Sequence, residues 1–121
     1  MSKRGKPLAF AISLVLLLVA PAAAEASWGS IAIDPETGKI GYSRGEATAA
    51  QAKAKAKNEC GTSHCKSAVW IFDGYAAVVQ KKSGIYISGI GRTKNLAFSD
   101  ARERAHEQSA RSIAWVFSGY S

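Results

Sequence analysis

Two segments of this chain, separated by a constant offset of 45 positions, have nearly the same sequence. Residues 65–75 read CKSAVWIFDGY, and residues 110–120 read ARSIAWVFSGY. The identical pairs are Ser67 and Ser112, Trp70 and Trp115, Phe72 and Phe117, Gly74 and Gly119, and Tyr75 and Tyr120. Because chance rarely gives so dense a match, we interpret the chain as two copies of one unit, at about 28–73 and 75–118.

Each copy has the pattern of a strand–strand–helix–strand unit. Short runs rich in β-branched and aromatic residues predict strands, at residues 28–33, 39–43 and 67–72 in the first copy and 75–80, 85–90 and 112–117 in the second. The first two strands of the first copy are separated by DPETG, in which Asp34 is read as a turn residue. The third strand of each copy is apolar on both faces and is therefore expected at the centre of a sheet.

The helix of the first copy is predicted from the helix propensity of its residues and not from the spacing of its apolar residues. Residues 49–57 (AAQAKAKAK) partly alternate Ala with Lys, but both residue types favour helices over strands. Thr48 would cap the N-terminus of this helix. One helical face would then carry Ala49, Ala52, Ala56 and Cys60.

The second helix is expected at residues 99–108, with Ala101 and Ala105 facing inward. Together, these elements predict an α+β fold. We expect a six-stranded, mainly antiparallel sheet with both helices on one face.

Residues 1–24 have the order of a signal peptide. Three basic residues precede an uncharged run of 13 residues at positions 8–20, and Pro21 and small residues follow. As a helix this run covers only about 20 Å, less than the roughly 30 Å of a hydrocarbon core. Cleavage is predicted after Ala24, or as the next choice after Ala26. Residues 25–121 would then be a single domain, periplasmic or secreted, with no membrane span.

Removal of this segment changes the charge of the chain. The full sequence has 16 basic and 9 acidic residues, a net charge of +7. Cleavage removes three basic residues and leaves 13 − 9 = +4. Such a charge is ordinary for a soluble protein and does not predict a nucleic-acid partner.

The two cysteines, Cys60 and Cys65, lie at the expected helix-to-strand junction of the first copy. In the second copy Ser109 and Ala110 take their places, and the residues between them are missing in this alignment. A disulfide that closes a small loop fits both observations and the oxidising compartment, and contributes about 2 kcal/mol. The alternative is a metal or redox site that adds His64 as a third ligand.

No catalytic constellation stands out in the sequence. A serine nucleophile needs a positioned base, and neither His64 nor His106 lies within a recognisable motif. We therefore expect no enzyme activity, no metal and no cofactor.

Four residues form a candidate contact surface. Tyr42 and Tyr86 are expected on the sheet face opposite the helices, whereas Lys81 and Lys82 lie in a hairpin turn. The two lysines also fit an ordinary solvated loop. The duplicated aromatic residues Trp70, Phe72, Trp115 and Phe117 have apolar neighbours, so they are predicted to lie in the core.

Several of these features together resemble a known family. They are Trp28-Gly-Ser-Ile-Ala at the start of the mature chain, the Ala-rich helix that ends in Cys60, the Cys60 and Cys65 pair, Val69-Trp70, and Ala114-Trp115. They resemble the secreted bacterial family called domain of unknown function 4189. The resemblance implies a small exported protein and no established catalytic residues. The family often has further cysteines in the second copy, which this chain lacks.

The leading functional hypothesis is a non-catalytic exported protein that binds another protein or an envelope component. An open sheet face or a sheet edge would provide the contact. The alternatives are a binder of the cell-wall polymer peptidoglycan and, at lower weight, a small hydrolase or redox protein.

Overall fold

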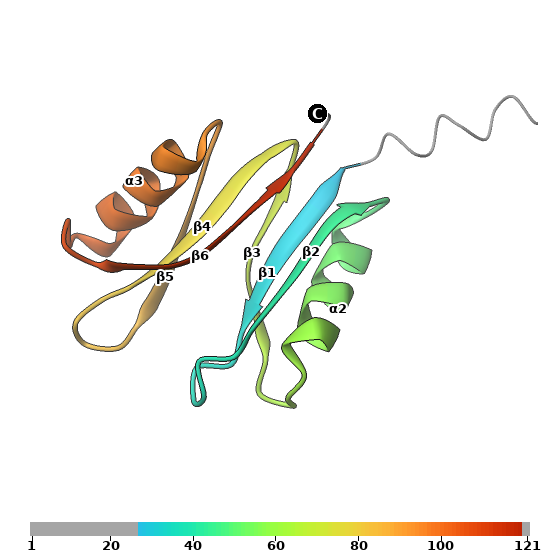
Figure 1. Cartoon of the computed structure of the whole chain (residues 1–121), viewed down its shortest axis with the longest axis horizontal. Coiled ribbons are helices and arrows are strands. Elements are labelled where there is room, and N and C mark those ends of the chain that lie inside the picture. Colours follow the sequence, from blue (N-terminus) through green and yellow to red (C-terminus); the bar gives the residue numbers. More distant parts are fainter. Residues whose placement is uncertain (1–26, 120–121) are drawn as a thin grey trace, which may run out of the picture.

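The computed structural model describes residues 27–119, so the predicted signal peptide and Tyr120 lie outside the described residues. The first half consists of β1 (Trp28–Ile33), β2 (Ile40–Glu46), α2 (Ala49–Cys60) and β3 (Lys66–Phe72). The second half consists of β4 (Gly74–Gln80), β5 (Tyr86–Gly91), α3 (Lys94–Ala105) and β6 (Arg111–Ser118). The strand–strand–helix–strand order of both halves and the α+β class are confirmed (Figure 1).

The six strands divide into two antiparallel sheets, where the sequence predicts one. The strand order is β2-β1-β3 in the first sheet and β5-β4-β6 in the second. The division occurs between β3 and β4, which are separated only by Asp73 in a left-handed conformation (φ 57). Because common hairpin loops have at least two residues, the chain cannot fold back beside β3 there and instead enters the other sheet.

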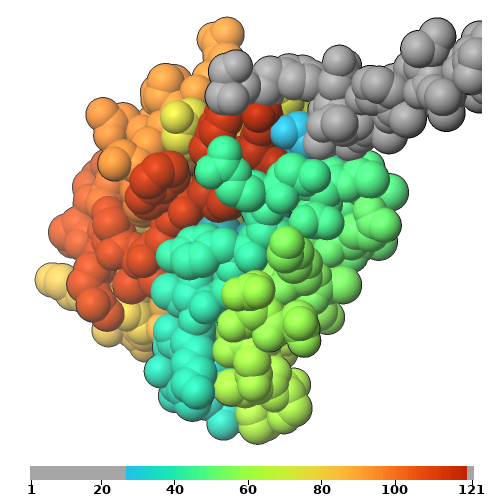
Figure 2. Space-filling model, turned by 45° about the vertical axis from the view of Figure 1, so that its right-hand side comes forward, coloured from blue at the N-terminus to red at the C-terminus, as the bar shows by residue number. Residues whose placement is uncertain are grey.

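The sheets pack face to face, and each helix covers the outer face of its own sheet (Figure 1). The core between the sheets contains Ile31, Ile33 and Val69 from the first sheet and Ala76, Val78, Ala114 and Val116 from the second. The helices therefore lie on opposite sides of the molecule, not on one face of a single sheet. The physical reason is that both inner faces are apolar and bury each other. The two halves meet along a seam that is visible on the surface (Figure 2).

The central strands are β1 and β4, whereas β3 and β6 lie at the edges of their sheets. The sequence predicts the opposite, because the third strand of each half is apolar at consecutive positions. Burial explains the difference. Residues 29–33 of β1 and 76–79 of β4 are buried at every position, but β3 and β6 are buried on one face only.

Threonine caps fix the start of both helices. The Thr48 side chain accepts a hydrogen bond from the Gln51 N–H, and the Thr93 side chain accepts one from the Leu96 N–H, both at 3.1 Å. The first helix has the predicted cap, and three of the four residues predicted on its sheet-facing side are buried, whereas Ala49 is half-buried. The second helix occupies 94–105 and not the predicted 99–108, because the Thr93 side chain caps its N-terminus and starts it five residues earlier.

The helices lie very close to their sheets because both contact surfaces are made of small residues. The buried positions are Ala52, Ala56 and Cys60 in α2 and Ala97, Ala101 and Ala105 in α3. On the sheet side, a β-carbon at Gly41 would overlap the carbonyl oxygen of Ala56, and one at Gly89 would overlap the backbone nitrogen of Ala101. Each helix therefore rests almost directly on the strand backbone.

We expect G41A and G89A each to lower the free energy of unfolding by about 2 kcal/mol, because the added methyl group forces the helix away from the sheet. Urea unfolding of the purified domain measures this. G45N is the matched control: Gly45 also lies in β2, has open space around it and has a positive φ that Asn tolerates. Equal stability of G41A and G45N would contradict the close packing.

Candidate functional site

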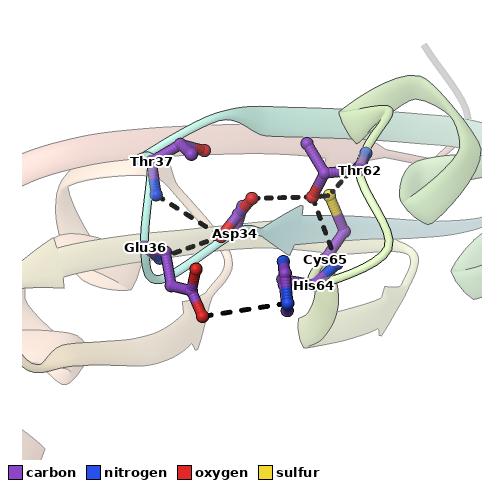
Figure 3. A network of polar contacts seen from close by, with 6 residues as sticks. All are labelled: Asp34, Glu36, Thr37, Thr62, His64 and Cys65. Carbon is purple, nitrogen blue, oxygen red and sulfur yellow. Dashed lines mark hydrogen bonds and ion pairs between the residues drawn. The ribbon is translucent and has the colours of Figure 1, made fainter.

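A buried carboxylate organises the end of the first half that lies beside the disulfide loop (Figure 3). Asp34 follows β1 and is only 1% exposed. Its Oδ1 accepts hydrogen bonds from the Glu36 N–H at 2.8 Å and from the Thr37 N–H at 3.4 Å. Its Oδ2 accepts a hydrogen bond from the Thr62 hydroxyl at 2.6 Å. The turn role predicted for Asp34 is thus confirmed, and the contact with Thr62 joins this turn to the loop after α2.

The loop that carries Thr62 is closed by a disulfide between Cys60 and Cys65, whose Cα atoms are 6.2 Å apart. The predicted pairing therefore agrees with the structure. Because both sulfurs are bonded to each other, neither is a thiolate that could ligate a metal together with His64. The His64 ring instead faces Glu36, with Nε2 and Oε2 at 3.9 Å (Figure 3). The cluster is a structural clamp between the β1–β2 turn and the disulfide loop.

Hydrogen bonding decides the ionisation of Asp34. The Thr62 hydroxyl, followed by the main-chain N–H groups of Glu36 and Thr37, lowers the pKa of this carboxyl from 3.8 to about 2, although burial opposes the shift. A carboxyl whose pKa is lowered by folding stabilises the folded state above its unfolded pKa. That contribution is lost as the pH falls through the folded pKa.

The second half contains the same loop without the disulfide. With α3 at 94–105, the constant offset of 45 continues through both helices and both loops. Cys60 then corresponds to Ala105, and Cys65 corresponds to Ala110 rather than to a shortened loop. Both alanines are buried in one cluster, as both cysteines are in theirs. The alignment that places Ser109 opposite Cys60 and omits the loop is therefore wrong, because the second helix begins at Lys94 and not at residue 99.

The four predicted contact residues do not form one surface. Tyr42 is exposed on β2, and Tyr86 is half-buried against the core between the sheets. Lys81 and Lys82 line a separate hollow beside the β4–β5 turn. The other sheet covers most of the sheet face on which the tyrosines are expected, but it leaves Tyr42 exposed. Whether any of the four contacts a partner stays a prediction.

Three of the four aromatic residues that the sequence places in the core are exposed, and Phe117 is half-buried. Trp70 is 46% exposed, Phe72 49% and Trp115 44%. In β3 the side chain of Val69 points toward the other sheet, so Trp70 and Phe72 point outward. The helices pack mainly over the first two strands of their sheets, which leaves the outer faces of β3 and β6 open.

These residues form two equivalent clusters, which we call the aromatic strips. The first strip contains Trp28, Trp70 and Phe72, and the second contains Tyr75, Trp115 and Phe117. Trp28 lies opposite Phe72 in the β1–β3 register, with ring centroids 5.1 Å apart. Tyr75 lies opposite Phe117 in the β4–β6 register, with ring centroids 4.7 Å apart. Tyr42 and Arg44 line a hollow beside the second strip.

A groove runs between each helix and the neighbouring edge strand. The first groove is lined by Ala50, Lys53, Ala54, Lys57, Cys65, Lys66, Ser67 and Trp70. The second groove is lined by Lys94, Asn95, Phe98, Arg102, Ser112, Ile113, Ala114 and Trp115. At the offset of 45, Lys57 corresponds to Arg102, Ser67 to Ser112 and Trp70 to Trp115. The sequence could have indicated these grooves, because each of the three aligned pairs consists of identical or chemically similar residues.

Comparison with known proteins agrees with this architecture. The family model described as Domain of unknown function (DUF4189) matches residues 28–116, which include most of both halves. The chain belongs to the DUF4189 family. The resemblance drawn from its short motifs is thus confirmed.

One solved structure similar to this DUF4189 chain is the NMR structure of Rv1813c from Mycobacterium tuberculosis. The two sequences are 29% identical, the match covers 75% of this chain and 74% of that chain, and the TM-score is 0.58. No curated protein matches the chain. The family and the similar structure support the fold and leave the activity open.

We expect T62V to raise the pKa of Asp34 toward 3.8, because the variant loses the hydroxyl that stabilises the carboxylate. An NMR pH titration of the Asp34 carboxyl carbon measures the shift. The same variant should be less stable than the wild type above pH 4, and the difference should narrow as the pH falls to about 2. S63A, in the same loop, is the control, and an unchanged Asp34 pKa in T62V would contradict the assignment.

We also expect A105C/A110C to form a second disulfide, because these positions correspond to Cys60 and Cys65. It should raise the free energy of unfolding by about 2 kcal/mol. Mass spectrometry after alkylation counts free thiols, and A105S/A110S controls for the change of side chain. Two free thiols in the oxidised variant would show that the two loops differ in geometry.

Proposed function

We propose that this chain is an exported, non-catalytic binding module that contacts a partner protein through its aromatic strips. One observation carries the proposal: large aromatic side chains are exposed at equivalent positions of both halves. Contiguous exposed apolar surface commonly marks an interaction site, and aromatic residues dominate the binding energy of protein interfaces. If these side chains were buried in the core, burial alone would account for them, and no binding partner would have to be inferred.

The strands that carry the strips support a protein partner. The segments KSAVWIF of β3 and RSIAWVFS of β6 each have one charged residue, at the first position, and no proline. Natural proteins usually protect edge strands with charges, prolines or bulges. Each of these edge strands has one β-bulge, at Ala68 in β3 and at Ile113 in β6. The regular segments after the bulges, residues 69–72 and 114–118, are suited to pair with an extended segment of another protein.

Export is supported by the signal-like N-terminus and by the disulfide, which is typical of oxidising compartments. Among residues 27–119, no helix is long and apolar enough to cross a membrane. The non-catalytic assignment is supported by the use of the buried Asp34 carboxylate in a structural clamp, where both of its oxygens already accept hydrogen bonds.

We expect W70A/W115A in the mature chain to abolish capture of the partner from the organism's own envelope fraction. The two tryptophans are exposed, so circular dichroism should show an intact fold. The matched control is I85A/L96A, which removes two exposed apolar side chains that line neither groove. Equal capture by wild type and W70A/W115A would contradict the proposal. Cosedimentation with purified, protein-free cell-wall polymer would favour the polymer binder instead.

A further inference from the structure

We infer that each groove is a site for an extended acidic peptide segment, so that the chain presents two equivalent sites. This inference rests on the proposed function and adds the chemistry of the partner. The segment would lie along the open edge of β3 or β6. Its carboxylates would face cations from the helix, and its apolar side chains would contact the edge-strand tryptophan.

Each groove holds a positive charge over an edge-strand tryptophan. The Lys53 Nζ lies 4.0 Å from the ring centroid of Trp70, and the Lys94 Nζ lies 4.9 Å from that of Trp115. These cation–π contacts bring ammonium groups of the helices out over the edge strands. The two lysines are not aligned at the offset of 45, since Phe98 corresponds to Lys53. Lysines at different positions of the two helices thus place an ammonium group over the edge-strand tryptophan in both halves.

The groove cations have no internal counter-charge. Within residues 27–119 the ion pairs are Lys55–Glu46, Arg104–Asp100 and His64–Glu36, all outside the grooves. No carboxylate from the described part of the chain lines either groove, whereas the first has three lysines and the second has Lys94 and Arg102. Charge complementarity therefore requires an anionic occupant. A second copy of this chain is disfavoured, because it would bring like charges together.

The strand edges favour a peptide over an anionic polysaccharide. Along one side, β3 is hydrogen-bonded to β1 and β6 to β4, and among the six described strands neither has a partner on its other side. A free edge presents backbone N–H and C=O groups at the repeat of an extended peptide, and alternate side chains of an added strand point to the same face. A sugar chain matches neither the spacing of these backbone groups nor the alternation of the side chains. The small side chains of Ala50 and Ala54 leave the helix side of the first groove unobstructed.

The experiment uses isothermal titration calorimetry of the disulfide-bonded mature chain with a synthetic peptide that alternates Glu with Val. We expect about two peptides to bind per chain, as strand addition at both edges requires, with affinity that falls as salt is added. K53Q should leave about one site intact and weaken the other about fivefold. K53Q/K94Q should weaken both, while a Lys–Val peptide should not bind.

The matched control is K39Q/R92Q, which removes the same charge at two exposed positions outside both grooves. Equal weakening by K39Q/R92Q and K53Q/K94Q would overturn the inference, because binding would then reflect overall charge. Binding of polygalacturonate but not of the peptide would overturn it in favour of an anionic polymer. If the peptide does not bind but W70A/W115A still abolishes partner capture, the acidic chemistry is wrong and the proposed function stands.

Discussion

The burial of two apolar sheet faces against each other is the interaction on which the rest of this structure depends. Ile31 and Ile33 of the first sheet meet Val78 and Val116 of the second, and neither α2 nor α3 contributes a residue to this core. Each sheet thus has only its outer face left for a helix. A helix is about 10 Å wide and strands are about 4.8 Å apart, so a single helix covers about two strands. The third strand of each sheet is left open, which is why the aromatic strips are exposed.

The two halves use the same backbone plan but stabilise it differently. In the first half, the loop after the helix is closed by the disulfide and joined through Thr62 to the buried Asp34. In the second half, Ala105 and Ala110 occupy the positions of the cysteines, and packing of small side chains replaces the covalent bond. The extra clamp of the first half is therefore an addition to a fold that the second half forms without it.

In the grooves, by contrast, both halves have the same chemistry, a cation over a tryptophan ring, but the cation comes from a different helix position in each half. Trp70 and Trp115 are aligned in the sequence, but the cations above them come from different helix positions. A surface that served only solubility would not require a positive charge over the same ring in both halves. The polar clamp around Asp34 is accounted for by its contribution to stability, whereas exposed aromatic strips contribute little to stability and are therefore the better candidates for binding.

The sequence by itself determined the order of the elements, the first helix with its Thr48 cap, the turn at Asp34, the cysteine pair and the family, because each depends on residues close together in the chain. Tertiary structure alone decided that the strands form two sheets, that β1 and β4 are central, and that Trp70 and Trp115 face solvent. A run such as SAVWIF shows that a strand has two apolar faces. Which of those faces is covered depends on segments far away in the sequence, and here the other sheet covers one while the narrow helix leaves the other open.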